Sequence, residues 1–236
     1  MPSFAIIVPC YNEASRIQAS QFISFVKEQS DIQFYFIDDG STDNTENILS
    51  KMQQSSSRIT TISLGKNSGK GEAIRKGFIE ALRHHHRFVG YLDADLSTGL
   101  EEFLRLKEIV AAKNLDLVLG SRIKKIDTII ERSLFRHIVG RIIATIIDQR
   151  FKLGVYDTQC GAKIFRSSVI EPIAHERFYT KWFFDVEILL RIKKKHIDCK
   201  AAEIPLCKWQ NVLNSKLSIL SFPAVIKDLL VLLNKY

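Results

Sequence analysis

Short apolar runs alternate with helical patterns along the first 122 residues, and this alternation restricts the possible folds most strongly. Strands are expected at residues 4–8, 32–38, 59–64, 88–95 and 115–122, because each run is short, rich in β-branched and aromatic residues, and bounded by turn residues. Helices are expected between them, including one that begins near Glu13 with Asn12 as its N-cap. Such alternation requires βαβ crossovers, so we predict an α/β fold with a mostly parallel sheet covered by helices on both faces.

Acidic residues stand at the ends of three of the predicted strands. The first strand leads to Glu13, the second ends at Asp38–Asp39, and the fourth ends at Asp93 and Asp95. Open parallel sheets bind ligands outside the carboxyl ends of their strands, so these acids are expected to line one crevice. Clustered carboxylates repel one another, and their convergence therefore indicates a function rather than a contribution to stability.

Asp93 and Asp95 lie one residue apart, in the stretch "YLDADLST". Carboxylates at this spacing suit a hard cation, because Mg²⁺ and Mn²⁺ prefer oxygen ligands and Mg²⁺ often binds one or two carboxylates together with substrate phosphates. A pair of exposed turn carboxylates that cap the next helix is the alternative. The other acids of the predicted crevice favour the metal site.

The glycine-rich stretch "NSGKGEAIRKGF", residues 67–78, resembles a P-loop only superficially. Its glycine spacing is one residue too short, and Gly71 stands where Ser or Thr should follow Lys70. Lys70 at a helix start can still bind a phosphate, or it can be a solvated side chain in a flexible turn. Both interpretations remain open for Lys70.

The net charge of +8 calls for an acidic partner such as a nucleotide, a nucleic acid or an anionic membrane surface. The basic residues are spread over several helices and form no patch with stacking aromatics, so no nucleic-acid partner is expected. The four cysteines form no CxxC pair, which argues against a zinc site and indicates reduced thiols in the cytoplasm. No run of about 18 apolar residues is present, so no membrane span is expected.

The second half of the chain is less regular. Residues 132–150 predict an amphipathic helix with an isoleucine-rich row and several arginines; 183–195 and 219–234 predict two further helices, and 155–165 a loop that runs into a strand. The isoleucine-rich row of this helix either packs on the sheet or faces the acyl chains of an anionic membrane. The two interpretations can each hold for a part of the row. Residues 1–236 are expected to form a single catalytic domain, with a nucleotide-sugar half at about 1–122 and an acceptor half at about 123–236.

Several stretches, in order, resemble glycosyltransferase family 2, which has the GT-A fold. They are "IIVPCYNEASRI", "FIDDGSTDNT", "NSGKGEAIRKGF", "YLDADLST" and "VLGSR". The later "ERSLFR", "DTQCGAKIFR" and "WFFDVEIL" are more similar to dolichyl-phosphate (polyprenyl-phosphate) β-glucosyltransferases. The resemblance spans about residues 4–210. It implies metal-dependent, inverting transfer of a hexose, with UDP-glucose as donor, Mg²⁺ or Mn²⁺ as cofactor and polyprenyl or dolichyl phosphate as acceptor.

On the donor side the resemblance implies several binding residues. The nucleotide sugar would be bound by Pro9, Tyr11, Glu13, Asp39 and Asp93, and the metal by Asp93 and Asp95. Asp95 is the firmer metal ligand of the two. Lys70 is a further candidate for the nucleotide sugar, from its place at a helix start. Members from eukaryotes carry an N-terminal membrane anchor, and because this sequence shows none, attachment is expected to be peripheral, at the cytoplasmic face of a membrane.

On the acceptor side the resemblance implies that Arg122, Arg132 and Arg136 bind the lipid phosphate. Asp157 is expected near the transferred sugar, as an orienting group rather than a base, so Asp95, Arg122 and Asp157 are the candidate catalytic residues. Three alternatives stay open: a GDP-mannose-dependent polyprenyl-phosphate mannosyltransferase, a soluble family 2 enzyme that glycosylates a glycan or protein, and a catalytically silent nucleotide-binding protein. The oligomeric state is left undetermined.

Overall fold

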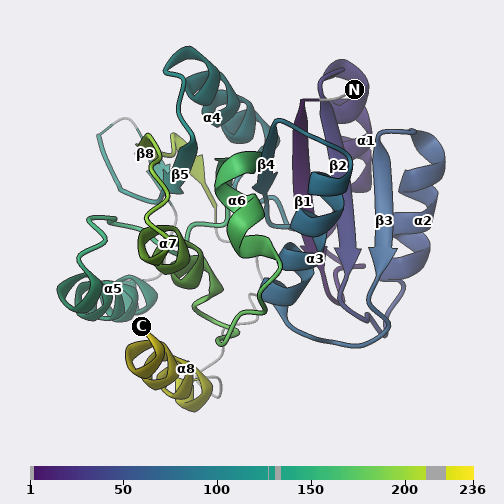
Figure 1. The fold of residues 1–236 in the computed structure, drawn as a ribbon. Coiled ribbons are helices and arrows are strands. Elements are labelled where there is room, and N and C mark those ends of the chain that lie inside the picture. The colour runs from purple at the N-terminus through teal and green to yellow at the C-terminus, as the bar shows by residue number, and fades with distance from the viewer. Residues whose placement is uncertain (1–2, 127, 131–133, 211–221) are drawn as a thin grey trace.

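A seven-stranded sheet forms the centre of the computed structural model, which describes residues 3–126, 128–130, 134–210 and 222–236 (Figure 1). Its strands, in spatial order, are β3 (Ile59–Ser63), β2 (Ile32–Asp38), β1 (Phe4–Cys10), β4 (Phe88–Tyr91), β7 (Lys163–Arg166), β5 (Leu117–Ser121) and β8 (Ala201–Pro205). A small second sheet pairs β6 (Ile129–Ile130) with β9 (Lys208–Trp209). The predicted α/β fold with a mostly parallel sheet is confirmed.

Helices cover both faces of the large sheet. Of these helices, α1 (Ala19–Glu28), α2 (Thr45–Ser55) and α4 (Leu100–Ala112) pack on one face, and α3 (Lys70–Arg83), α6 (Ser167–Ala174) and α7 (Phe184–Lys194) on the other. Successive side chains of a strand point to opposite faces, so Ile6 joins the first cluster with Phe22 and Phe103, whereas Ile7 joins the second with Phe78. Burial on both faces explains why the strands are almost continuously apolar.

The strand order reverses at β1. This strand pairs in parallel with β2 on one side and with β4 on the other, so the carboxyl ends of β1 and β4 lie next to each other. Residues 11–13 and 92–95 follow those two ends. The crevice expected from the acidic strand ends therefore corresponds to the switch point of the sheet.

Three local predictions were wrong. No helix begins near Glu13: residues 13–17 form a turn in which Glu13 O accepts hydrogen bonds from Arg16 N and Ile17 N, and α1 begins only at Ala19. Asn12 does not cap a helix but adopts a left-handed φ of 51°, and its Oδ1 accepts a bond from Thr42 N. In addition, β4 ends at Tyr91, so the two aspartates belong to the loop that follows the strand.

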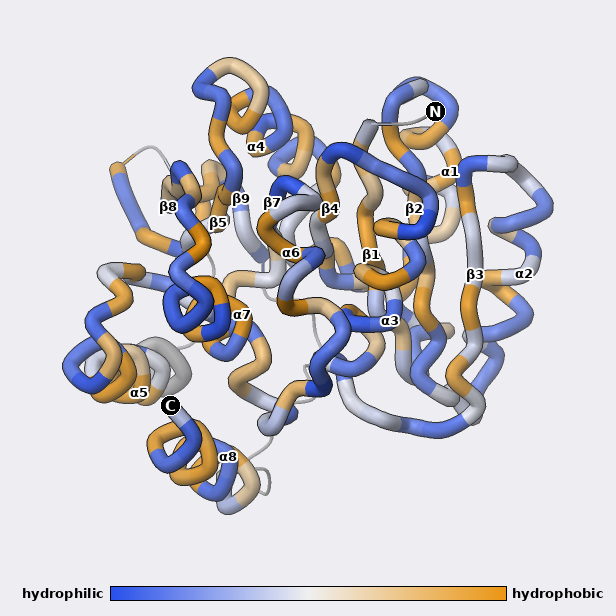
Figure 2. Tube along the Cα trace, in the orientation of Figure 1, coloured by the Kyte–Doolittle hydropathy of each residue, from blue (hydrophilic) through white to orange (hydrophobic). Residues whose placement is uncertain are grey.

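Two helices from the second half of the chain, α5 (Leu134–Phe151) and α8 (Phe222–Lys235), pack beside α7 (Figure 1). They correspond to the helices predicted at 132–150 and 219–234. A third apolar cluster joins the three helices through Ile147, Val186 and Leu232, among others. The isoleucine row of α5 does not pack on the sheet, because Ile138 and Ile142 are each 57% exposed. Figure 2 shows apolar stretches along both α5 and α8. Within the described part of the chain, no helix combines the length and apolarity that a membrane span requires.

Gly77 in α3 lies directly against β1, and this contact generates a stability prediction. A Cβ at Gly77 would lie 2.5 Å from Cγ2 of Ile7. We expect Gly77→Ala to lower the free energy of unfolding by about 1–3 kcal/mol, because overpacking outweighs the higher helix propensity of alanine. Urea denaturation measures this. The control Lys76→Ala, at an exposed position of the same helix, should change it by less than about 0.5 kcal/mol. Equal stability of Gly77→Ala and the wild type would contradict the close packing.

Candidate active site

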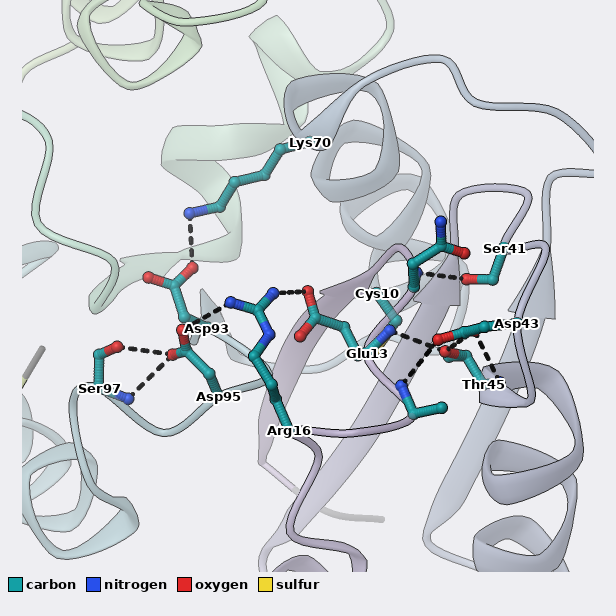
Figure 3. A network of polar contacts seen from close by, with 12 residues as sticks. Cys10, Glu13, Arg16, Ser41, Asp43, Thr45, Lys70, Asp93, Asp95 and Ser97 are labelled. Carbon is teal, nitrogen blue, oxygen red and sulfur yellow. Dashed lines mark hydrogen bonds and ion pairs between the residues drawn. The ribbon is translucent and has the colours of Figure 1, made fainter. Parts of the chain in front are cut away.

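Three acids meet at the switch point, together with two basic side chains (Figure 3). Glu13 follows β1 and is 6% exposed, and its Oε1 accepts a hydrogen bond of 2.6 Å from Nη2 of Arg16. The other terminal nitrogen of Arg16, Nη1, lies 3.8 Å from Oδ2 of Asp95. Arg16 therefore lies between a carboxylate from the end of β1 and a carboxylate from the loop after β4.

Asp93 has its own cationic neighbour. Nζ of Lys70, at the start of α3, donates to Oδ1 of Asp93 at 2.5 Å, while Ser97 donates to Oδ1 of Asp95 through its amide at 3.0 Å and its hydroxyl at 2.7 Å. Gly161 approaches Asp93 so closely that any Cβ there would overlap with the carboxylate. The structure thus brings Glu13, Lys70, Asp93 and Asp95 together, as expected from their places in the sequence.

The two aspartates are the candidate ligands for a divalent cation. Among the residues that the structure describes, no group of three or more His, Cys, Asp or Glu side chains could hold a metal. A pair of carboxylates one residue apart, with one oxygen of Asp95 directed toward Arg16 and one of Asp93 bonded to Lys70, does not form a closed cage. It fits a Mg²⁺ or Mn²⁺ whose remaining ligands are water and phosphate oxygens.

Asp39 lies at the end of β2, where it is 3% exposed. Its two carboxylate oxygens accept hydrogen bonds of 2.7 Å each from the amides of Ser68 and Gly69, just before α3. Burial raises the pKa of Asp39, and it outweighs the opposing effect of these two donors. Asp39 therefore fastens the loop that carries Lys70 to the end of β2.

The remaining donor-side candidates lie on β1 or directly after it. Pro9 is part of the strand and pairs with Ile37 of β2, and Tyr11 follows the strand as a partly exposed side chain. Both belong to the same chain segment as Glu13, at the carboxyl end of β1.

Arg122 and Asp157 form a bidentate ion pair at the end of β5. Nε and Nη2 of Arg122 donate to the two oxygens of Asp157 at 2.7 and 2.8 Å, and the Arg122 amide adds a third bond of 3.0 Å. Burial acts to raise the pKa of Asp157, but the guanidinium more than offsets it and lowers this pKa to about 2. Asp157 is therefore a carboxylate at neutral pH, and it is a weak base.

A pocket borders this ion pair. Its lining comprises Arg122, Gly140, Arg141, Ile143, Ala144, Ile147, Tyr156, Asp157, Thr158 and Gln159. Arg141 of α5 stacks over the Tyr156 ring at 3.8 Å and donates to the Tyr156 carbonyl at 2.7 Å. The pocket is thus basic at Arg122 and Arg141 and apolar along α5, which connects it to the helix that bears the exposed isoleucines.

Two predicted acceptor residues cannot be placed. Arg132 lies outside the described residues, and Arg136 belongs to α5 but its side chain is likewise outside the described part. Sequence reasoning also missed several site-forming residues. Arg16 carried a usable signal, because it stands three residues after Glu13 in a polar turn. The buried pair of Lys163 and Asp185 carried none, because its partners lie 22 residues apart.

Comparisons with known proteins agree with this geometry. Solved structures with the same fold include mannosyl-3-phosphoglycerate synthase from Rubrobacter xylanophilus, with a TM-score of 0.73 at 15% identity over 99% of this chain and 74% of that one. Another is glucosyl-3-phosphoglycerate synthase from Mycobacterium tuberculosis in complex with Mn²⁺, uridine-diphosphate and phosphoglyceric acid, with a TM-score of 0.71 at 17% identity over 98% and 78%. The fold is that of the GT-A glycosyltransferases.

Sequence relatives identify the family. The family model "Glycosyl transferase family 2" matches residues 5–173. A dolichyl-phosphate beta-glucosyltransferase from Dictyostelium discoideum is 32% identical over 90% of this chain and 68% of its own length, and one from Saccharomyces cerevisiae is 29% identical over 98% and 74%. The chain belongs to glycosyltransferase family 2, and it is a glycosyltransferase. The family prediction from the sequence is confirmed.

The Arg122–Asp157 pair predicts a pH-dependent contribution to stability. Asp157→Asn should lower the free energy of unfolding by about 2 kcal/mol at pH 7, because the pKa of Asp157 falls from its ordinary 3.8 to about 2 on folding. A carboxyl group whose pKa is lower in the folded than in the unfolded protein stabilises the fold at pH values above its unfolded pKa. The loss of stability in Asp157→Asn should therefore stay constant down to about pH 5 and shrink as the pH falls through 3.8 toward 2. Urea denaturation at pH 7, 5 and 3 measures it.

Glu28→Gln is the control for this experiment, because it removes an exposed carboxylate at the end of α1. Its effect should stay within about 0.5 kcal/mol at each pH. A deficit of Asp157→Asn that grows toward acid pH would be incompatible with a depressed Asp157 pKa.

Proposed function

We propose that this chain transfers glucose from UDP-glucose to polyprenyl or dolichyl phosphate, with inversion at the anomeric carbon and with Mg²⁺ or Mn²⁺ as cofactor. The supporting observation is the pairing of two sites: paired carboxylates beside Lys70 at the switch point, and a basic pocket that opens along α5. The acceptor and the sugar follow the names of the relatives, which are dolichyl-phosphate beta-glucosyltransferases.

The donor half would bind the nucleotide sugar at the switch point. Pro9, Tyr11, Glu13 and Asp39 would surround the base and ribose, and Lys70 would pair with the diphosphate next to Asp93. A cation held by Asp93 and Asp95 would neutralise the charge that the leaving diphosphate gains as the C1–O bond breaks. The M. tuberculosis neighbour, crystallised with Mn²⁺ and uridine-diphosphate, supports a site of this chemistry.

The acceptor half would bind a phosphate. A phosphate oxygen is already anionic at neutral pH, so it attacks without a general base, but it needs cationic groups to approach an anionic donor. Arg122 would supply such a group, together with Arg132 and Arg136. Asp157, with its pKa of about 2, suits a role in orienting Arg122 and the sugar hydroxyls rather than in abstracting a proton.

A transfer assay tests this proposal. The wild type is incubated with polyprenyl phosphate, Mg²⁺ or Mn²⁺ and, in turn, UDP-glucose, GDP-mannose and other nucleotide sugars, and the lipid product is identified by mass spectrometry. We expect polyprenyl-phosphate glucose from UDP-glucose, its loss with EDTA, and a rate reduced at least about 100-fold in Asp95→Ala. Asp93→Ala should keep some activity. A mannolipid from GDP-mannose would support the alternative donor, and absence of any glycolipid would refute the proposed reaction.

A lipid acceptor also requires contact with a membrane, and two helices suit this contact. Exposed apolar residues recur at Ile138, Ile142 and Ile146 of α5 and at Ile226 and Leu230 of α8. Arg150 of α5 and Lys227 of α8 are exposed as well, so both helices also carry exposed basic residues. We propose that this surface lies on an anionic bilayer, peripherally and on the cytoplasmic side, with the Arg122 pocket next to the headgroups.

Flotation with vesicles that contain anionic lipid tests the membrane surface. Ile142→Glu/Leu230→Glu should reduce the bound fraction at least about fivefold, because each charge would have to enter the apolar layer. The control Gln54→Glu/Ser57→Glu adds the same charge near the end of α2 and should bind like the wild type. If the two double variants float equally, this surface is not the membrane contact.

A further inference from the structure

Arg16 is held in one place by the local backbone. It lies in the turn at 13–17, where its own amide donates to Glu13 O at 2.8 Å, and its side chain is only 10% exposed. One end of the guanidinium is fixed by the 2.6 Å bond to Glu13. The other end faces Asp95 at 3.8 Å, so a guanidinium that is also paired with Glu13 stands beside a candidate metal ligand (Figure 3).

A fixed positive charge at this distance has opposite effects on two ligands. It repels a divalent cation that binds to Asp95 alone, because like charges a few ångströms apart interact strongly at a partly buried site. It attracts an anionic diphosphate, whose negative charge then offsets the repulsion. Lys70 likewise places a positive charge next to Asp93. Its side chain is 40% exposed, so water screens this charge more effectively.

We propose that Arg16 makes metal binding depend on the nucleotide. In this role, which rests on the proposed metal and nucleotide site, Arg16 lowers the affinity of Asp93 and Asp95 for a free divalent cation. The site then accepts the metal mainly together with a nucleoside diphosphate. Arg16 is thus a positioning residue that couples the nucleoside side of the crevice, through Glu13, to the metal side, through Asp95. By linkage, the metal should strengthen nucleotide binding by the same factor.

Mn²⁺ binding to the full chain tests this role without any turnover. Free Mn²⁺ is followed by electron paramagnetic resonance, with and without UDP or GDP. In the wild type, we expect weak binding of Mn²⁺ alone and a strong enhancement by the nucleotide. In Arg16→Gln, Mn²⁺ alone should bind about tenfold more tightly, and the enhancement by the nucleotide should fall about tenfold, within the range of ordinary coupling between sites. Arg16→Lys, which keeps the charge, should restore most of the wild-type behaviour.

Matched variants separate this effect from net charge and from misfolding. Arg83→Gln removes an equal charge from an exposed pair with Glu80 at the end of α3, and should bind Mn²⁺ like the wild type. If Arg16→Gln does not fold, Arg16→Met keeps the aliphatic stem and replaces it in the test. Unchanged Mn²⁺ affinity and unchanged enhancement in a folded Arg16 variant would refute the role of Arg16 alone. A wild type that binds no Mn²⁺, even with UDP or GDP, would refute the proposed metal site and this role together.

Discussion

The carboxylates at the adjacent carboxyl ends of β1 and β4 repel one another, and the surrounding structure has to offset this repulsion. Arg16 and Lys70 each bring a positive charge to these acids, and Ser97 brings two hydrogen-bond donors. The scaffold fixes where these groups stand. A Cβ at Gly71 would lie 2.7 Å from Cβ of Phe184, so the start of α3 packs closely on α7 and Lys70 is directed toward Asp93. The packing of α3 against α7 thereby helps to set the electrostatics at the switch point.

A buried ion pair links the loop at 157–162 to the same acids. Lys163 is fully buried, and its ammonium donates to Oδ1 of Asp185 and to the carbonyl of Cys160 at 2.6 Å each, while Tyr91 also donates to Asp185. Burial of a charged group is costly unless the group is paired, and Lys163 is paired with Asp185. Because Lys163 also donates to the carbonyl of Cys160, this pair holds the loop at 157–162 in place. That loop places Gly161 against the Asp93 carboxylate. The loop at 157–162 is therefore mechanically connected to the aspartates that follow β4.

Local patterns account for what the sequence predicts well. A short apolar run that ends in an acid specifies both a buried strand and a polar group at its end, so the parallel strands and the convergence of Glu13, Asp93 and Asp95 follow from local residues. The antiparallel insertion of β7 between β4 and β5 does not. Its four residues begin with Lys163, which is buried only because Asp185, distant in sequence, neutralises it. The strands β6 and β9 have two residues each, and the five residues of β8 are partly or fully exposed, so no apolar run or alternation marks them in the sequence.

The outward isoleucine row of α5 shows why one sequence pattern supported two interpretations. The helix carries two apolar rows at four-residue spacing: Ile143, Ile147 and Phe151 pack in the cluster with α7 and α8, whereas Ile138, Ile142 and Ile146 are exposed. Periodicity identifies both rows but does not say which one a neighbour covers. A helix that packs against its neighbours on one side buries one row, so the positions of α7 and α8 determine which row of α5 is buried. The exposed isoleucines belong to the same helix that lines the Arg122 pocket. An apolar layer in contact with these isoleucines would therefore lie next to the cationic side chains of that pocket.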